Sequence, residues 1–229
     1  MNRVLITTIP FAINDKKPLD MFDAAGIEYV INPLGKKPNE EELAEMIQDF
    51  DAVVAGTEPY TEYVLKKADR LKMIARVGVG VDSVPLNICR ERNIMVSYTP
   101  DAVVDAVAEL TVSFVFLSMR PILMMNSSMK NQIWQKLLGR ELKEVVIGII
   151  GLGKIGYKVA ELLAPFKPKE ILVHDVIDRS LAIENMTTNG CSIKQVDFDQ
   201  VIKNVDLLTL HVPLSNHTKG MISKKELLY

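Results

Sequence analysis

The chain has 229 residues, of which 48% are hydrophobic and 24% are charged, as in an ordinary globular protein. Its formal net charge of −2 gives no reason to expect a nucleic-acid partner or an acidic membrane surface. The cysteines, Cys89 and Cys191, are too few for a disulfide framework and have no partner at metal-ligand spacing, so we expect a reducing cytoplasm and no metal. The longest uncharged apolar stretch, from Leu110 to Met119, is too short to span a membrane, and the apolar start of the chain lacks a signal-peptide cleavage site.

The N-terminal part of the chain alternates between strand-like and helix-like patterns. The expected strands cover residues 4–8, 28–31, 51–55, 73–77 and 94–98. Helices are expected over residues 19–25, 39–50 and 61–67, and a further helix is expected to be capped by Ser83 with Pro85 in its first turn. Asn39 and Glu42 have the spacing of a capping box. This alternation predicts an α/β domain over residues 1–98 with a parallel sheet and crossover helices.

A second domain is expected over residues 99–229. It opens with a long helical segment from Pro100, which Pro121 kinks or divides into two helices. Residues 131–140, which include Trp134, form a polar connector. Strands are then expected over residues 145–150, 171–173, 191–196 and 206–211, with helices over 157–166 and 198–202.

The glycine motif Gly151-Leu152-Gly153-Lys154-Ile155-Gly156 lies between an expected buried strand and an expected helix. Gly151 allows a sharp turn, Gly153 leaves room for a pyrophosphate against the backbone, and Gly156 lets the helix pack closely on the sheet. The free amides and dipole of the helix N-terminus favour the phosphates. The pattern therefore predicts a dinucleotide site; the alternative is a tight structural turn.

Asp175 follows the next expected strand, 24 residues after Gly151. An acid at this place accepts hydrogen bonds from the adenosine ribose diol and repels a 2′-phosphate, which predicts NAD(H) rather than NADP(H). Arg179, four residues further on, is the feature that would weaken this preference. If the glycine turn is purely structural, Asp175 is a solvated residue at the end of a strand.

With this unit placed after an α/β domain, the chain resembles the D-isomer-specific 2-hydroxyacid dehydrogenases. The matching segments are 76–82, which resembles the substrate loop, 99–100 and 105–111 at the start of the interdomain helix, and 148–156, 210–214 and 218–222 in the cofactor domain. Two further segments, 56–59 and 129–134, favour the phosphoglycerate dehydrogenase branch of that family.

The resemblance implies a flavodoxin-like substrate domain and a Rossmann-type NAD-binding domain that is incomplete at its C-terminus. It also implies a homodimer formed through the cofactor domain, around residues 101–134. The backbone amides of Gly78, Val79 and Gly80 would bind the substrate carboxylate, with Val79 also near the nicotinamide. The alternative for Gly78 and Gly80 is a flexible strand-to-helix loop.

The resemblance also assigns roles along the cofactor domain. Lys154 and Ile155 would cover the pyrophosphate, while Val212 and Pro213 would pack beside the cofactor. The family's catalytic arginine, glutamate and histidine lie downstream of the segment matched by residues 223–229, of which residues 225–229 should belong to a helix, so no catalytic residue is expected before Tyr229.

The three histidines, His174, His211 and His217, do not occupy the family's catalytic position, and no arginine follows His211. The strand over residues 207–212 would be an open sheet edge, because only the first four strands of the order 3-2-1-4-5-6 are expected here. An edge of this kind is prone to pair with other chains.

The first functional hypothesis is an NAD-dependent oxidoreductase that acts on the CH–OH group of a D-2-hydroxy acid. Candidate substrates are 3-phosphoglycerate or, in the reverse direction, 2-oxo acids of the hydroxypyruvate and glyoxylate type. The alternatives are a non-catalytic NAD(H)-binding regulatory protein and a remnant without function. The choice between them stays open at the level of the sequence.

Overall fold

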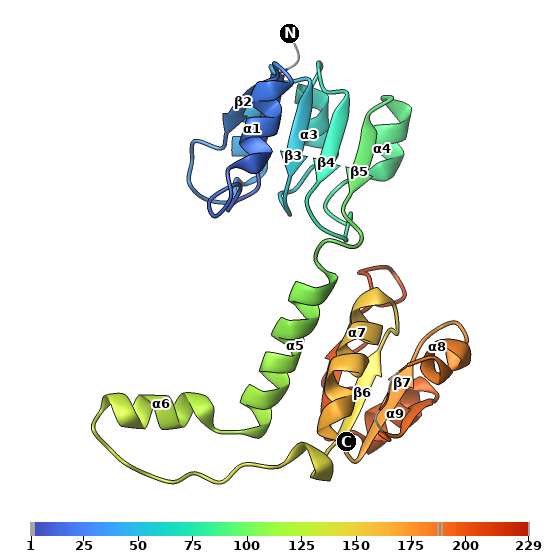
Figure 1. The fold of residues 1–229 in the computed structure, drawn as a ribbon. Helices are drawn as coiled ribbons and strands as arrows, with labels where there is room; N and C mark the ends of the chain where they lie inside the picture. The colour runs from blue at the N-terminus through green and yellow to red at the C-terminus, as the bar shows by residue number, and fades with distance from the viewer. Residues whose placement is uncertain (1–2, 187, 189, 229) are drawn as a thin grey trace. The chain divides into compact units, whose positions relative to one another are not determined.

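The computed structural model describes residues 3–186, 188 and 190–228 (Figure 1). The chain divides into two compact units, Met1–Val103 and Val104–Tyr229. Both units are built on parallel sheets with crossover helices, which confirms the predicted α/β fold class. The expected domain boundary, between residues 98 and 99, lies a few residues before this division.

The first unit contains a five-stranded parallel sheet in the order β2-β1-β3-β4-β5, the flavodoxin-like order. Its strands are β1 (Arg3–Ile6), β2 (Glu28–Ile31), β3 (Ala52–Ala55), β4 (Met73–Arg76) and β5 (Met95–Tyr98). Its helices are α1 (Lys17–Ala24), α2 (Glu40–Met46), α3 (Glu62–Lys67) and α4 (Leu86–Glu91). All five predicted strands and all four predicted helices of this part are therefore present.

Capping hydrogen bonds explain where two of these helices, α2 and α3, begin. The predicted capping box of α2 is confirmed: the Glu42 amide donates to Asn39 Oδ1 at 2.8 Å, and the Asn39 amide donates to Glu42 Oε2 at 2.9 Å. Thr61 caps α3 in a similar way. The prediction that Ser83 caps α4 is wrong, because Pro85 is the N-cap residue and no side chain caps this helix. The Ser83 carbonyl instead accepts a hydrogen bond from the Tyr60 amide at 3.0 Å.

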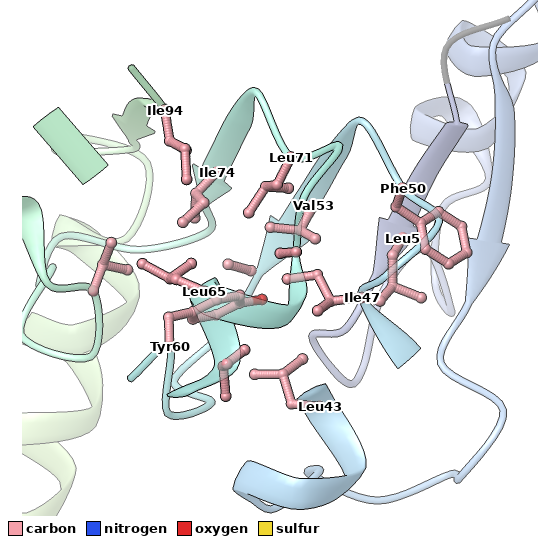
Figure 2. Packing of buried hydrophobic residues seen from close by; sticks show 14 of the residues in the cluster. Leu5, Leu43, Ile47, Phe50, Val53, Tyr60, Leu65, Leu71, Ile74 and Ile94 are labelled. Atoms are coloured by element: carbon pink, nitrogen blue, oxygen red, sulfur yellow. The ribbon is translucent and has the colours of Figure 1, made fainter. Parts of the chain in front are cut away.

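The main core of the first unit lies between the sheet and helices α2 and α3 (Figure 2). Leu5, Val53 and Ile74 point from three neighbouring strands toward Leu43 and other residues of the helices. Successive strand residues point to opposite faces, so Val4, Ile6 and Val54 form a second cluster with α1. Burial on both faces is the reason why these strands are almost continuously apolar.

The second unit contains a four-stranded parallel sheet in the order β8-β7-β6-β9. Its strands are β6 (Val146–Ile150), β7 (Glu170–His174), β8 (Ile193–Gln195) and β9 (Leu207–Leu210). This order corresponds to the first four strands, 3-2-1-4, of a Rossmann sheet, as predicted. In the part of the chain that the structure describes, β9 pairs only with β6 and forms the expected sheet edge.

Helices α5 (Val104–Met119) and α7 (Lys154–Leu163) pack against each other. Phe116 of α5 also contacts Phe166, in the 3₁₀ turn that follows α7, edge-on at 4.9 Å between ring centroids. The other helices are α6 (Ile122–Lys130), α8 (Ser180–Glu184), which was not predicted, and α9 (Phe198–Asn204). Short 3₁₀ turns are η1 (Leu142–Glu144), η2 (Ala164–Phe166) and η3 (Glu226–Leu228). The helix expected to include residues 225–229 is reduced to η3 in its described part, and Tyr229 lies outside the described residues.

A bend of 71° separates α5 from α6, so Pro121 starts a new helix rather than kinking a continuous one. Within the described residues, no single helix has the length and apolar composition needed to cross a membrane, and α5 and α6 meet those criteria only as a bent pair.

Candidate functional site

A cavity of about 550 Å³ opens at the carboxyl ends of β6, β7 and β9. It is lined by Ile150, Gly151, Gly153, His174, Asp175, Val176, Arg179, Phe198, His211, Val212, Pro213, His217, Thr218 and Met221. The chain runs from β6 outward to β7 and β8 on one side, and β9 lies on the other side. The cavity therefore occupies the topological switch point, where open α/β sheets bind ligands.

The glycine turn forms one wall of this cavity, and its three glycines differ in their surroundings. Gly151 has φ +92°, and a Cβ there would lie 2.7 Å from the His211 carbonyl oxygen, so this tight turn requires glycine. A Cβ on Gly156 would lie 2.0 Å from the Gly151 carbonyl oxygen. A Cβ on Gly153, in contrast, would meet no atom within 4 Å. The first and third glycines thus serve packing, and the second leaves open space.

Asp175 lies beside the glycine turn and is held there by three donors. Its Oδ2 accepts from the Leu152 amide at 2.8 Å and from Arg179 Nε at 3.0 Å, and its Oδ1 accepts from the Ile177 amide at 3.1 Å. Burial by itself opposes ionisation of this carboxyl, but the hydrogen bonds from Ile177, Leu152 and Arg179 outweigh it and hold its pKa below the ordinary value. Asp175 is therefore a fixed carboxylate tied to the glycine turn.

All three histidines of the chain line this cavity, a convergence that their separate positions in the sequence did not reveal. His174 Nδ1 lies 3.2 Å from the Val196 carbonyl oxygen, and its ring contacts Phe198 edge-on. His211 Nε2 lies 3.0 Å from Thr209 Oγ1, and burial lowers the pKa of His211, which favours its neutral form. Among the described residues, no group of three or more His, Cys, Asp or Glu side chains is arranged to hold a metal ion.

The cavity brings together five of the residues that the sequence singled out for cofactor binding: Gly151, Gly153, Asp175, Val212 and Pro213. Three more, Lys154, Ile155 and Gly156, form the first turn of α7 and do not line it. Sequence reasoning missed the lining residues after Pro213, which are His217, Thr218 and Met221, although Thr218 and Met221 belong to a segment that carries the resemblance. Thr218 Oγ1 donates to the Pro213 carbonyl at 2.6 Å and so fixes the loop that closes this side.

The remaining predicted residues, Gly78, Val79 and Gly80, lie on the loop after β4 in the first unit. Gly78 has φ +139°, its amide donates to Thr99 Oγ1 at 2.7 Å, and its carbonyl accepts from the Thr99 amide at 3.0 Å. The Arg76 guanidinium lies directly over Gly78, since a Cβ there would be 2.3 Å from Nη1. The Gly78 amide is thus engaged within the loop, whereas the structure describes no hydrogen bond from the amides of Val79 and Gly80.

Residues 56–59, one of the two segments that favoured the phosphoglycerate dehydrogenase branch, contribute to a buried polar cluster at the carboxyl end of the same sheet. Glu58 Oε2 accepts from the Gly56 amide at 2.7 Å and from Thr7 Oγ1 at 3.1 Å. The Tyr60 hydroxyl lies 2.9 Å from Thr7 Oγ1. These contacts give Gly56 and Glu58 a structural part in joining β1 to the loop after β3.

Comparison with known proteins places this arrangement in a family. Residues 4–221 match the model of the D-isomer specific 2-hydroxyacid dehydrogenase catalytic domain. The chain is 36% identical over 191 residues to a D-3-phosphoglycerate dehydrogenase of Methanocaldococcus jannaschii, covering 82% of this chain and 35% of that protein. It is 34% identical over 197 residues to a glyoxylate reductase of Thermofilum pendens, covering 83% and 57% of the two chains.

A solved structure supports the same placement. The NAD+-bound 3-phosphoglycerate dehydrogenase of Entamoeba histolytica superposes with a TM-score of 0.78 at 26% identity, covering 99% of this chain and 68% of that one. The fold and the switch-point cavity define a two-unit α/β protein whose second sheet has the strand order of a Rossmann sheet. The chain belongs to the D-isomer specific 2-hydroxyacid dehydrogenase family. It spans 35% and 57% of the length of the two curated relatives above.

Proposed function

We propose that the second unit binds NAD in the switch-point cavity. The observation that carries the proposal is that the glycine turn and the fixed Asp175 carboxylate lie side by side and line one cavity of about 550 Å³. That volume lies within the range of pockets that hold small molecules and cofactors. The residues present also fit the ligand, because the space beside Gly153 is open and α7 begins without a side chain that caps it. The NAD+ bound to the Entamoeba relative supports the same cofactor.

The proposed roles follow from these positions. Gly153, Lys154 and Ile155 at the start of α7 would hold the pyrophosphate, where backbone amides and the helix dipole favour anions. Asp175 would accept the ribose hydroxyls, and Val212 with Pro213 would form the wall beside the cofactor. Bound NAD supplies the hydride acceptor of the reaction.

We propose a D-2-hydroxy acid, or the corresponding 2-oxo acid, as the substrate of the whole protein. The amides of Val79 and Gly80 would bind its carboxylate, with Gly78 shaping the loop through Thr99. The 36% and 34% identities to a phosphoglycerate dehydrogenase and a glyoxylate reductase support both substrate types similarly, and 3-phosphoglycerate remains one candidate.

We propose that none of these 229 residues fills the role of the family's catalytic arginine, glutamate or histidine. The observation that favours this is that no arginine follows His211 in the sequence. A non-catalytic NAD(H)-binding protein is the second candidate, and the same observation favours it.

We also propose a homodimer in the cytoplasm, formed through α5, α6 and the connector that follows. This region exposes several large apolar side chains, among them Phe114, Leu123, Trp134 and Leu138, of which the last two are 86% and 90% exposed. Large apolar side chains left exposed on neighbouring segments are typical of an interaction region. Sedimentation of the wild type and of Leu123→Asp tests the proposal: the variant should sediment as a monomer and the wild type as a dimer.

The cofactor proposal is tested by calorimetric titration of the 229-residue chain with NAD and with NADP. NAD should bind more tightly than NADP, and Gly153→Ala should weaken NAD binding while its circular dichroism spectrum stays unchanged. If the folded wild type binds neither nucleotide, the proposal is wrong. Turnover of a D-2-hydroxy acid by this chain at an ordinary enzymatic rate would refute the placement of the catalytic residues.

A further inference from the structure

The second unit has another hollow, of about 200 Å³, away from the cofactor cavity. Several of its lining residues directly precede β6 and β7, so it lies at the amino ends of these strands, whereas the cofactor cavity lies at their carboxyl ends. The apolar part of its lining consists of Phe116, Met119, Leu142 and Phe166. The two phenylalanine rings meet edge-on, and Phe166 is 52% exposed. We call this site the amino-end hollow.

The charged residues that line the amino-end hollow are three cations and one carboxylate. Lys143 Nζ pairs with Glu141 Oε2 at 2.5 Å. Arg140 Nη1 pairs at 2.8 Å with Asp206 Oδ1, which does not line the hollow. Among the described residues, none forms a hydrogen bond or ion pair with the Arg120 guanidinium. Arg120 is therefore the cation of this hollow that is available to a ligand anion.

The backbone around Arg120 fixes where its side chain begins. The Arg140 amide donates to the Met119 carbonyl at 2.9 Å, which brings the end of the connector onto the last turn of α5. A Cβ on Gly139 would lie 2.7 Å from the same carbonyl oxygen and 3.0 Å from Arg120 Cδ, so this crossing leaves no room for a larger residue. The stem of Arg120 thus packs against the Gly139 backbone, which limits the directions in which the guanidinium can point.

We propose that the amino-end hollow binds a small aromatic carboxylate, at a site separate from the proposed NAD and substrate sites. The ring of the ligand lies against the two phenylalanines, where edge-on and offset aromatic contacts are favourable. Its carboxylate accepts from Arg120, because the planar fork of guanidinium N–H donors matches two carboxylate oxygens. The volume of about 200 Å³ is smaller than the pockets of about 300–1,000 Å³ that hold drug-sized ligands, so it suits a ligand with one ring.

The test titrates the chain with benzoate, with benzyl alcohol, which has the ring without the charge, and with acetate, which has the charge without the ring. Binding is followed by NMR of isotopically labelled methionine methyl groups. Met119 lines the amino-end hollow and Met221 lines the cofactor cavity, so their signals report the two sites separately. The variant is Arg120→Gln. Its matched control is Arg90→Gln, because Arg90 is an exposed arginine of the first unit and lines neither site.

Benzoate should shift the Met119 signal saturably and leave the Met221 signal in place, while benzyl alcohol and acetate bind more weakly. Arg120→Gln should weaken benzoate binding by about tenfold, the effect expected of one charge-assisted hydrogen bond, and Arg90→Gln should not change it. The inference is overturned if the Met119 signal does not move, if Arg120→Gln binds benzoate as the wild type does, or if benzyl alcohol or acetate binds as tightly as benzoate. It is also overturned if only the Leu123→Asp variant responds, because a second copy of the chain then covers the hollow.

Discussion

Gly156 and Gly153 stand three residues apart on the same turn, and the structure predicts opposite outcomes when each is changed to alanine. A Cβ on Gly156 would lie 2.0 Å from the Gly151 carbonyl oxygen, so the start of α7 and the turn must separate by about 1 Å. Overpacking of this kind destabilises a protein by about 1–3 kcal/mol, and a clash with a backbone atom lies toward the upper end of that range. Alanine in the helix gains back about 1 kcal/mol from helix propensity. We expect Gly156→Ala to lower the free energy of unfolding by about 1–2 kcal/mol.

Gly153→Ala is the matched comparison because its Cβ meets no atom within 4 Å and its φ of −73° suits any residue. As an N-cap residue, alanine is less favourable than glycine by less than about 1 kcal/mol. The new methyl group would occupy the space assigned to the pyrophosphate. This variant should therefore fold nearly as stably as the wild type and lose affinity for NAD.

The assay is urea unfolding followed by circular dichroism, with hydrogen exchange of peptides from β6 and α7 to assign the transition to the second unit. Titration with NAD is carried out on the same samples. If Gly156→Ala is as stable as the wild type, the close approach of α7 to the turn is not the reason for this glycine. If Gly153→Ala binds NAD as the wild type does, the space beside Gly153 does not hold the cofactor.

Three further outcomes are expected. Tyr60→Phe removes a buried hydroxyl that bonds Thr7 and should destabilise the first unit by about 1 kcal/mol, and an unchanged urea midpoint would contradict this. Burial lowers the pKa of His211, so its imidazole takes up a proton more readily in the unfolded chain than in the folded one. The free energy of unfolding should therefore be greatest above about pH 6.5 and decrease as the pH falls below that value. His211→Asn should reduce the difference between the urea midpoints measured at pH 7.5 and at pH 5.5. Leu210→Lys places a charge on the exposed end of β9 and should reduce concentration-dependent light scattering, whereas scattering equal to that of the wild type would show that this edge does not mediate association.

Most of the fold could be predicted because its strands are buried on both faces and its turns carry strong local signals. The apolar run at β6, the Asn39 capping box and Pro121 each determine their local structure through contacts with near neighbours. The prediction for Ser83 was wrong because a serine shortly before a proline resembles a helix cap. In the structure Pro85 is the N-cap residue of α4, so the Ser83 side chain does not cap the helix. Helix α8 was missed because it is only five residues long and has no buried residue to give it a periodic pattern.

The candidate site was predicted only where its residues are close in the sequence. The glycine turn and Asp175 could be found from their spacing alone. The convergence of His174, His211 and His217 depends on β7 and β9 ending at the same edge, which a list of separate motifs does not show. The engagement of the Gly78 amide by Thr99 depends in the same way on the pairing of β4 with β5.

The two cysteines give each unit its own internal reporter of unfolding. Cys89 lies in the core of the first unit and Cys191 in the core of the second, and burial raises the pKa of both thiols. Both are therefore protected from alkylation in the folded protein and become reactive when their own unit opens. A brief pulse of a thiol reagent at increasing urea, followed by peptide mass spectrometry, would yield two separate unfolding curves from one unmodified chain. Ligands that bind the second unit should shift the Cys191 curve alone wherever the two units unfold independently.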